Sequence, residues 1–155
     1  MQRIDELLEE IDVFRGLGDE HLDLIAGCAQ NRMFAAGDAL LTENEQANTC
    51  FAIRHGTVAL ETYVPQRGAV TIETLHGGDV VGWSWLFPPY RTMFDARALG
   101  VVRAIAFDGA CLRAKCEEDP QLGYVLMKRF AEVMVERLQA TRLRLLDVYG
   151  QVPGR

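Results

Sequence analysis

The sequence predicts an α+β protein that is mainly β, with short strands in the middle and helices at both ends. Between about Arg32 and Phe107, segments rich in β-branched and aromatic residues alternate with turns marked by glycine or asparagine. On both sides of this region, apolar residues recur every three or four positions, as on one face of a helix. Many short strands with regular turns imply a sandwich or a rolled-up barrel.

Residues 1–30 are expected to form the N-terminal helices. A first helix is indicated by apolar residues at helical spacing, namely Ile4, Leu7, Leu8 and Ile11. Gly16 and Gly18 then interrupt the pattern. A second helix follows, with Asp19 as its expected N-cap and an apolar stripe within residues 22–26.

Turn residues divide the segment 31–107 into strands. The turn His55-Gly56 separates two β-rich runs, 51–53 and 57–64. Pro65–Gly68 turns the chain into a further strand, and His76–Asp79 forms the next turn. A last run over 98–107 closes the region, with a glycine at position 100 that marks a bend or a bulge.

Residues 108–150 are expected to form the C-terminal helices. Asp108 can cap a short helix, and Asp119-Pro120 is a strong start signal for a second one that meets no breaker before Gly150. Its apolar seam is Met127, Phe130, Met134, Leu138, Thr141, Leu145 and Val148. Such a helix exceeds what a small set of strands can cover, so we expect its distal half to pair with a second copy. The alternative is packing wholly within its own domain.

Length and charge restrict the class of protein. The 155 residues suit a single domain, 1–155, and the net charge of −6 argues against direct nucleic-acid binding. The N-terminus lacks the features of a signal peptide, and no apolar run approaches the roughly 20 residues of a membrane helix. We therefore expect a cytoplasmic protein without a membrane partner. In that setting the four cysteines are expected to be buried packing residues: Cys28, Cys50, Cys111 and Cys116.

The sequence contains no catalytic or metal-binding pattern. The three histidines, His21, His55 and His76, are isolated from any cysteine or carboxylate at ligand spacing. A haem or iron–sulfur centre would need axial histidine or clustered cysteines. We expect no enzyme activity and no metal site.

The order of helices, strands, short helix and long helix resembles the cyclic-nucleotide-binding domain, the sensor of bacterial catabolite-activator-type (Crp/Fnr) regulators. The matching segments are Phe14–Leu17, Ala36–Asp38, Phe51–Val58 and Gly78–Gly82. Glycine at such turns allows positive φ or a close backbone approach, and Asn44 stands at a corner where the family often has glycine. The resemblance implies a double-stranded β-helix, or jelly-roll β-roll, over 31–107 and dimerisation through the last helix.

The resemblance also places a phosphate-binding cassette at residues 82–98. In the family, backbone N–H groups of a short helix and an arginine bind the cyclic phosphate, while a glutamate binds the ribose. Gly82 matches this pattern, but Trp83 stands at the glutamate position. Counting back from Ala98, the arginine position falls on Thr92, with Arg91 one residue earlier.

Two interpretations of this cassette remain open. In the first, Pro88-Pro89 re-routes the loop so that Arg91 still reaches the phosphate of cAMP or cGMP, with hydroxyl contacts from Ser84 and Thr92. In the second, which we favour, the site has abandoned cyclic nucleotides and holds another small ligand or none. The indoles at positions 83 and 85 would then line an apolar or stacking pocket. In an extended segment these two side chains share a face and Ser84 points the other way, and this argument lapses if the segment is helical.

Instead of contacting a ligand, Trp83 and Trp85 could simply pack in the core. We expect one of the two to do so. On the long helix, the resemblance places Thr141 where the family has a polar residue that touches the base, and Arg142 beside it could reach a ligand acid. Thr141 could equally interrupt the apolar seam. No cofactor is certain from the sequence.

Three functions fit these observations. The first is a ligand-sensing dimeric module that regulates a separate protein effector. The second is the sensor half of a Crp/Fnr-type transcription regulator truncated before its DNA-binding helix-turn-helix, which would begin where this sequence ends. The third is a non-binding dimeric scaffold.

Overall fold

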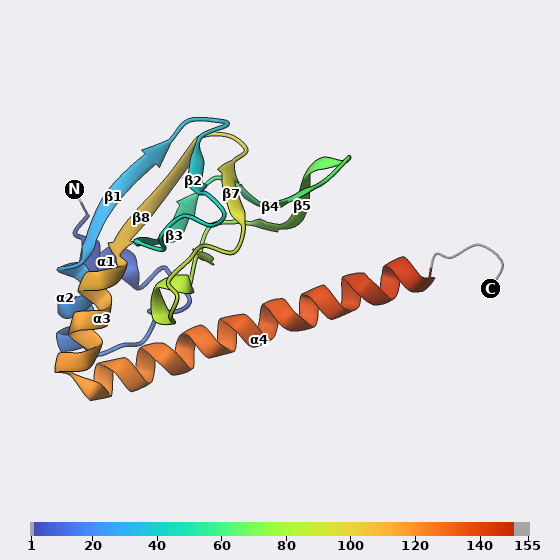
Figure 1. Cartoon of the computed structure of the whole chain (residues 1–155). Coiled ribbons are helices and arrows are strands. Elements are labelled where there is room, and N and C mark those ends of the chain that lie inside the picture. Colours follow the sequence, from blue (N-terminus) through green and yellow to red (C-terminus); the bar gives the residue numbers. More distant parts are fainter. Residues whose placement is uncertain (1, 151–155) are drawn as a thin grey trace.

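The computed structural model describes residues 2–150 of the chain (Figure 1). The helices are α1 (Ile4–Leu8), α2 (Asp19–Ala26), the 3-10 helix η1 (Ser84–Leu86), α3 (Gly109–Glu118) and α4 (Pro120–Gly150). The strands are β1 (Ala29–Phe34), β2 (Ala39–Leu41), β3 (Thr49–His55), β4 (Val58–Val64), β5 (Gly68–Leu75), β6 (Val80–Val81), β7 (Asp95–Ala98) and β8 (Val102–Asp108).

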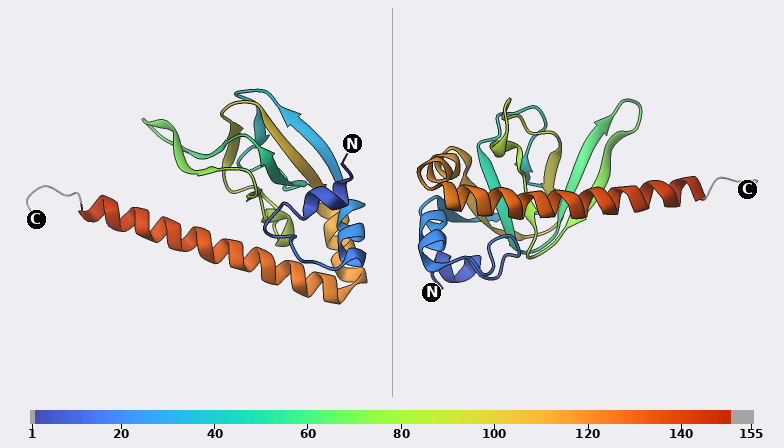
Figure 2. Two further views of the ribbon diagram at one scale, coloured as in Figure 1. Left: turned by 180° about the vertical axis from the view of Figure 1, so that it is seen from behind. Right: turned by 90° about the horizontal axis from the view of Figure 1, so that it is seen from below.

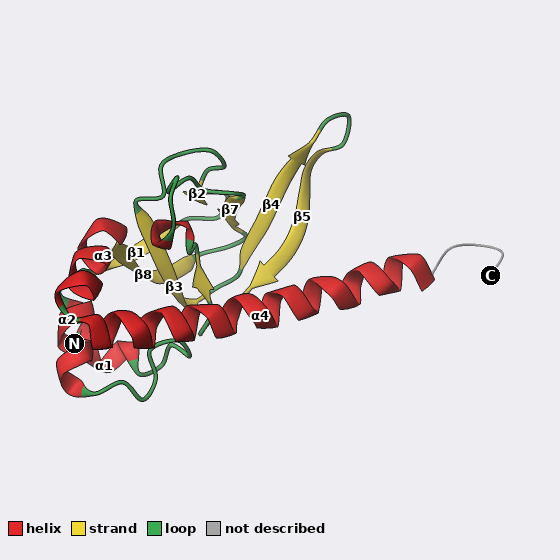
Figure 3. Ribbon diagram, turned by 60° about the horizontal axis from the view of Figure 1, so that its bottom comes forward, coloured by secondary structure: helices red, strands yellow, loops and turns green. Residues whose placement is uncertain are grey.

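The strands form two four-stranded antiparallel sheets, which confirms the predicted β-roll. One sheet has the order β1-β8-β3-β6 and the other β2-β7-β4-β5. Strands adjacent in space are mostly distant in sequence, so the chain passes repeatedly between the sheets. Among the described residues, only the β4–β5 hairpin pairs consecutive strands, and its tip projects from the roll and away from α4 (Figure 3). The fold is therefore α+β with a jelly-roll body.

Two apolar clusters hold the molecule together. The first fills the roll, where side chains such as Phe51, Ile53 and Leu60 are buried between the sheets. The second lies beneath the helices and joins the outer face of the sheet of β3 and β8 to α1–α4, with Phe14 against Phe107 at 5.0 Å between ring centroids. Strand β3 is buried on both faces because it serves both clusters.

Both N-terminal helices form, but α1 ends at Leu8, so Ile11 of the expected stripe lies in the turn that follows, and the expected cap of the second helix is displaced. Gly18, with extended backbone, occupies the N-cap position, and Asp19 is already the first helical residue. Asp19 and Glu20 thus lie in the first turn, where their negative charges interact favourably with the positive end of the helix dipole. The prediction of Asp19 as the cap was wrong by one residue.

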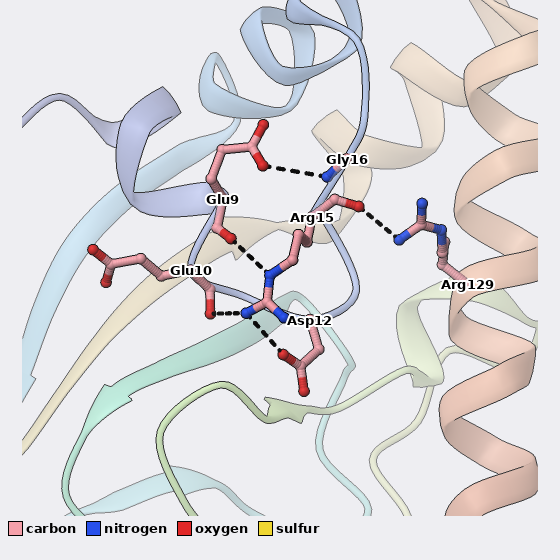
Figure 4. A network of polar contacts seen from close by, with 6 residues as sticks. All are labelled: Glu9, Glu10, Asp12, Arg15, Gly16 and Arg129. Atoms are coloured by element: carbon pink, nitrogen blue, oxygen red, sulfur yellow. Dashed lines mark hydrogen bonds and ion pairs between the residues drawn. The ribbon is translucent and has the colours of Figure 1, made fainter.

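A polar network fixes the loop between α1 and α2 (Figure 4). Arg15 donates to the carbonyl oxygens of Glu9 and Glu10, at 3.2 and 3.3 Å, and forms an ion pair with Asp12 at 3.2 Å. Arg129 of α4 donates to the Arg15 carbonyl at 2.8 Å. An arginine–carbonyl hydrogen bond therefore joins α4 to the N-terminal loop.

The C-terminal helices begin where their caps predict. The Asp108 carboxylate accepts from the Cys111 N–H at 2.9 Å, and the Asp119 carboxylate accepts from the Leu122 N–H at 3.2 Å. α4 then continues for 31 residues, and its distal end projects beyond the roll (Figures 1 and 2). All residues of 141–150 are exposed. Nowhere in residues 2–150 is a helix both long and apolar enough to cross a membrane.

The cysteines differ from their prediction as separate packing residues. Cys28 and Cys111 are joined by a disulfide across a sequence separation of 83 residues. Cys50 is buried and Cys116 half-buried, and both are free thiols. The folding of α3 against the start of β1 brings the bonded pair together, which no local spacing reveals.

We predict that Gly56→Ala lowers the free energy of unfolding by roughly 2–4 kcal/mol, because the variant combines backbone strain at a positive φ with a steric clash. Gly56 has a φ of +97°, and a methyl group there would overlap the Val101 carbonyl and meet the Val102 Cα at 3.0 Å. Gly37→Ala is the matched control, since Gly37 has a φ of +90° but open space around it. That variant should lose only about 1 kcal/mol. Denaturant unfolding measures both, and equal losses would contradict the steric argument.

Candidate functional site

The cassette of residues 82–98 connects β6 to β7 and begins with a tight turn. Gly82 has a φ of +89°, and a side chain there would press on Leu41 Cδ1 at 3.1 Å. The short helix η1 follows at once, and the loop after it contains a cis Pro88-Pro89 peptide bond. The segment therefore has the short helix that the resemblance implies, and the argument from an extended segment does not apply to it.

Of the two tryptophans, Trp85 is the core residue. Its side chain is only 1% exposed and meets the Phe130 ring of α4 edge-on, with 5.5 Å between centroids. Gly109, the first residue of α3, lies so close that a methyl group there would meet the Trp85 Cβ at 2.8 Å. Ser84 between the tryptophans is half-buried. Trp85 thus joins the cassette to both C-terminal helices.

Trp83 is half-buried and stacks against an arginine of α4. The Arg137 guanidinium carbon lies 4.8 Å from the centre of the Trp83 ring. One terminal nitrogen of Arg137, Nη2, donates to the Val80 carbonyl of β6. Cation–π stacking and a charged hydrogen bond therefore link α4 to the strand that precedes the cassette.

Burial changes the chemistry of Arg137. Removal from water lowers the pKa of its guanidinium, an effect that the nearby carboxylates of Glu73 and Asp79 oppose. Its second terminal nitrogen, Nη1, is buried and has no hydrogen-bond partner among residues 2–150. A buried donor without a partner is costly, so this nitrogen is a natural point of contact for an acceptor.

Arg91 and Thr92 lie on the other arm of the cassette. The exposed Arg91 donates through Nη1 to the Asn44 carbonyl at 3.1 Å, and its backbone bridges to Gln46. Thr92 is 5% exposed and exchanges backbone hydrogen bonds with Asn44 and Glu45. It lines a cavity of about 180 Å³ between the β2–β3 loop and the cassette. No hydrogen bond within the described chain joins Arg91 to residues 82–84.

Thr141 and Arg142 lie on the exposed part of α4. The Thr141 hydroxyl donates to the Arg137 carbonyl at 2.8 Å, within its own helix, and both side chains are exposed. The structure thus brings together Trp83, Arg137 and, one helical turn on, Thr141. It does not bring Arg91, Thr92 or Arg142 to that group.

Arg137 is the residue that the sequence analysis missed. A signal was available, because Arg137 stands four residues before Thr141 and therefore on the same face of α4. It is also the middle of three arginines on α4 that donate to carbonyls of the body. Arg129 donates to Arg15, Arg137 to Val80 and Arg144 to Ile72 of β5.

The cavity beside Arg137 is small and acidic. It has a volume of about 160 Å³ and is lined by four carboxylates together with Arg137, namely Asp12, Glu73, Asp79 and Glu136. Negative charge in such numbers disfavours an anionic ligand at this point. The chemistry of this cavity therefore differs from that of a phosphate site.

Several solved structures are similar to the chain. A protein described as cyclic nucleotide-binding from Geobacter metallireducens GS-15 is 30% identical, with a TM-score of 0.79 over 89% of this chain and 99% of that one. A cyclic nucleotide-binding domain from Methylobacillus flagellatus KT has the same TM-score of 0.79 at 19% identity, over 99% of this chain and 84% of that one. The catabolite activator protein of Thermus thermophilus gives 0.70 at 20% identity, over 89% of this chain and 63% of that one.

A comparison with curated proteins found no match. The family model described as "Cyclic nucleotide-binding domain" matches residues 31–119, which span the roll, the cassette and α3. This match covers more than half of the 155 residues, and the Geobacter protein agrees with it over most of the chain. The chain therefore belongs to the cyclic nucleotide-binding domain family of regulatory domains.

Proposed function

We propose that this chain is a dimeric regulatory module whose cassette has diverged from cyclic nucleotides but still communicates with helix α4. The stacking of Trp83 on Arg137 is the observation that carries the proposal. In the family, the residue at the Trp83 position is the glutamate that binds the ribose. Here an indole replaces the carboxylate, and the α4 arginine is already engaged with it at 4.8 Å.

The cassette arginine supports the same conclusion. Arg91 is exposed and hydrogen-bonded to the Asn44 carbonyl, so a cyclic phosphate would have to compete for its guanidinium. The cavity next to Arg137, which no residue of the cassette lines, carries four carboxylates, so a phosphate is disfavoured on that side of the guanidinium. A site built on hydrogen bonds discriminates strongly when one partner group is lost. A small neutral or cationic ligand with one acceptor for Arg137 Nη1 fits these groups better.

Helix α4 supplies the output in this proposal. Its packing face is held by Leu122, Leu126 and Phe130, all fully buried, whereas Leu138 and Leu145 of the seam are 61% and 54% exposed. Two such helices can bury these leucines against each other, and each fully buried leucine contributes about 1.5–3 kcal/mol. A ligand that favours one position of Trp83 would then bias the position of α4 and hence the dimer.

We predict that calorimetric titration with cAMP or cGMP gives no binding heat, either for the unaltered protein or for Arg91→Ala. The reason is the missing carboxylate together with the engaged Arg91. A catabolite activator protein titrated in parallel is the positive control, because it shows that the nucleotide solutions give a binding heat. Micromolar binding that disappears in Arg91→Ala would contradict the proposal and identify Arg91 as a phosphate anchor.

We predict that Arg137→Ala loosens α4 without unfolding the roll. The variant loses the stack on Trp83 and the hydrogen bond to Val80, together worth about 1–3 kcal/mol. Hydrogen exchange in residues 134–148 should then accelerate roughly tenfold, and Trp83 emission should move toward that of a water-exposed indole. Lys128→Ala on an exposed face of α4 is the control. Equal exchange in the two variants would show that Arg137 does not couple cassette and helix.

We predict that Leu138→Asp with Leu145→Asp converts the protein to a monomer. Leu143→Asp is the matched control: it is 64% exposed and lies about 140° around the helix from Leu138. That variant should remain dimeric. Analytical ultracentrifugation measures the mass of each. A monomeric unaltered protein, or a dimer lost only in Leu143→Asp, would contradict pairing through this seam.

A further inference from the structure

The two bonded cysteines are held together by more than their disulfide. Cys28 lies between α2 and β1, and its carbonyl accepts from the Asp108 N–H at 3.0 Å. Cys111 lies in the first turn of α3, and its N–H donates to the Asp108 carboxylate at 2.9 Å. Asp108 therefore positions both residues, whose Cα atoms are 5.6 Å apart. The two sulfur atoms would remain within reach of each other after reduction.

The bonded pair also faces an open cavity. Cys28 and Cys111 line a cavity of about 440 Å³ together with residues of the α2–β1 junction, β3 and β8, among them Gly27, Thr49 and Asp108. Cys111 is half-buried, whereas Cys28 is only 7% exposed. A thiol reagent can therefore approach from the Cys111 side. Accessible disulfides exchange more readily than enclosed ones.

The other two cysteines lack these properties. Burial raises the pKa of the Cys50 thiol to about 12, so it stays protonated and unreactive. Burial also raises the pKa of Cys116, and the neighbouring Asp119 and Glu117 act in the same direction. Reversible thiol chemistry is thus favoured at Cys28 and Cys111 rather than at Cys50 and Cys116.

We propose that Cys28 and Cys111 form a reversible thiol–disulfide site that ties the α2–β1 junction to α3. In oxidation, one thiolate attacks a peroxide oxygen, the O–O bond breaks, and the cysteine becomes a sulfenic acid. The hydroxide or alkoxide that leaves takes a proton from solvent and departs as water or an alcohol. The second thiol then displaces water from it and forms the S–S bond. In reduction, a dithiol attacks the bond, leaves as its own disulfide and returns two thiols. This inference needs no ligand in the cassette.

Helix α3 links the oxidation state of Cys28 and Cys111 to the cassette. Its first residue, Gly109, packs directly on Trp85, and Arg113 donates through Nη1 to the Trp85 carbonyl at 2.7 Å. The Arg113 guanidinium also lies 4.3 Å from the centre of the Tyr90 ring. With the disulfide intact, α3 is fixed covalently to the start of β1. After reduction it is held there by the Asp108 hydrogen bonds and packing, so the cassette becomes more mobile.

The test uses the full chain with Cys50→Ser and Cys116→Ser, which leaves only the proposed pair. After treatment with hydrogen peroxide, maleimide labelling in denaturant should find no free thiol, and peptide mapping should find Cys28 linked to Cys111. Dithiothreitol added to the folded protein should restore both thiols. The melting temperature should fall on the order of 10 °C on reduction. Hydrogen exchange in residues 84–92 should accelerate at least about threefold.

Two results would overturn the reversible thiol–disulfide chemistry. One is that both thiols remain free after peroxide treatment, and the other is that dithiothreitol cannot reduce the bond in the folded protein. Equal exchange in residues 84–92 before and after reduction would overturn the link to the cassette. Cys28→Ser with Cys111→Ser mimics the reduced state without a redox reagent. Made in the same Cys50→Ser and Cys116→Ser background, it should give the faster exchange in either buffer, and exchange as slow as in the oxidised pair would overturn the link to the cassette.

Discussion

The packing of Trp85 between α3 and α4 is the contact on which the arrangement of the cassette depends. Its indole meets Phe130 of α4 edge-on and its Cβ lies against Gly109 of α3. α3 and α4 also approach each other closely at Gly123, where a methyl group would meet the Cys116 carbonyl at 2.9 Å. Glycine at these two points lets α3 pack closely on η1 at one end and on α4 near the other, so α3 fixes both elements relative to each other.

This constraint explains why the two tryptophans have different roles. Trp85 is enclosed by apolar groups and contributes packing, whereas Trp83 precedes the 3-10 helix and reaches the guanidinium of Arg137. A family site that uses a carboxylate depends on a ligand hydroxyl to complete its contacts. Here the indole of Trp83 is stacked on Arg137 without a ligand, although Nη1 of that arginine has no acceptor among residues 2–150. Helix α4 is therefore already docked on the cassette through Trp83 and on β6 through the Val80 carbonyl.

Much of the fold was predictable because its signals are local. Glycines at tight turns, the Asp108 cap and the Asp119-Pro120 start each depend on a few neighbouring residues. The contacts of the site are not local. The Arg137 side chain is long and flexible, and its partners Val80 and Trp83 lie more than fifty residues earlier in the sequence. The pairing of Cys28 with Cys111 likewise depends on how α3 packs, so spacing could not reveal it.

The three arginines of α4 suggest how the helix is divided between two tasks. Arg129, Arg137 and Arg144 recur every seven or eight residues and donate to the α1–α2 loop, β6 and β5 in turn. These three arginines attach one face of α4 to the body of the domain along much of the helix. The contacts are polar, so they do not use the apolar side chains of α4 as core packing would. Because the row leaves the leucine seam exposed, α4 can be held by its own domain and still present an apolar face. Arg137 is the member of the row that also contacts the cassette, because its guanidinium stacks on Trp83, so the cassette and the apolar face are joined through one residue of α4.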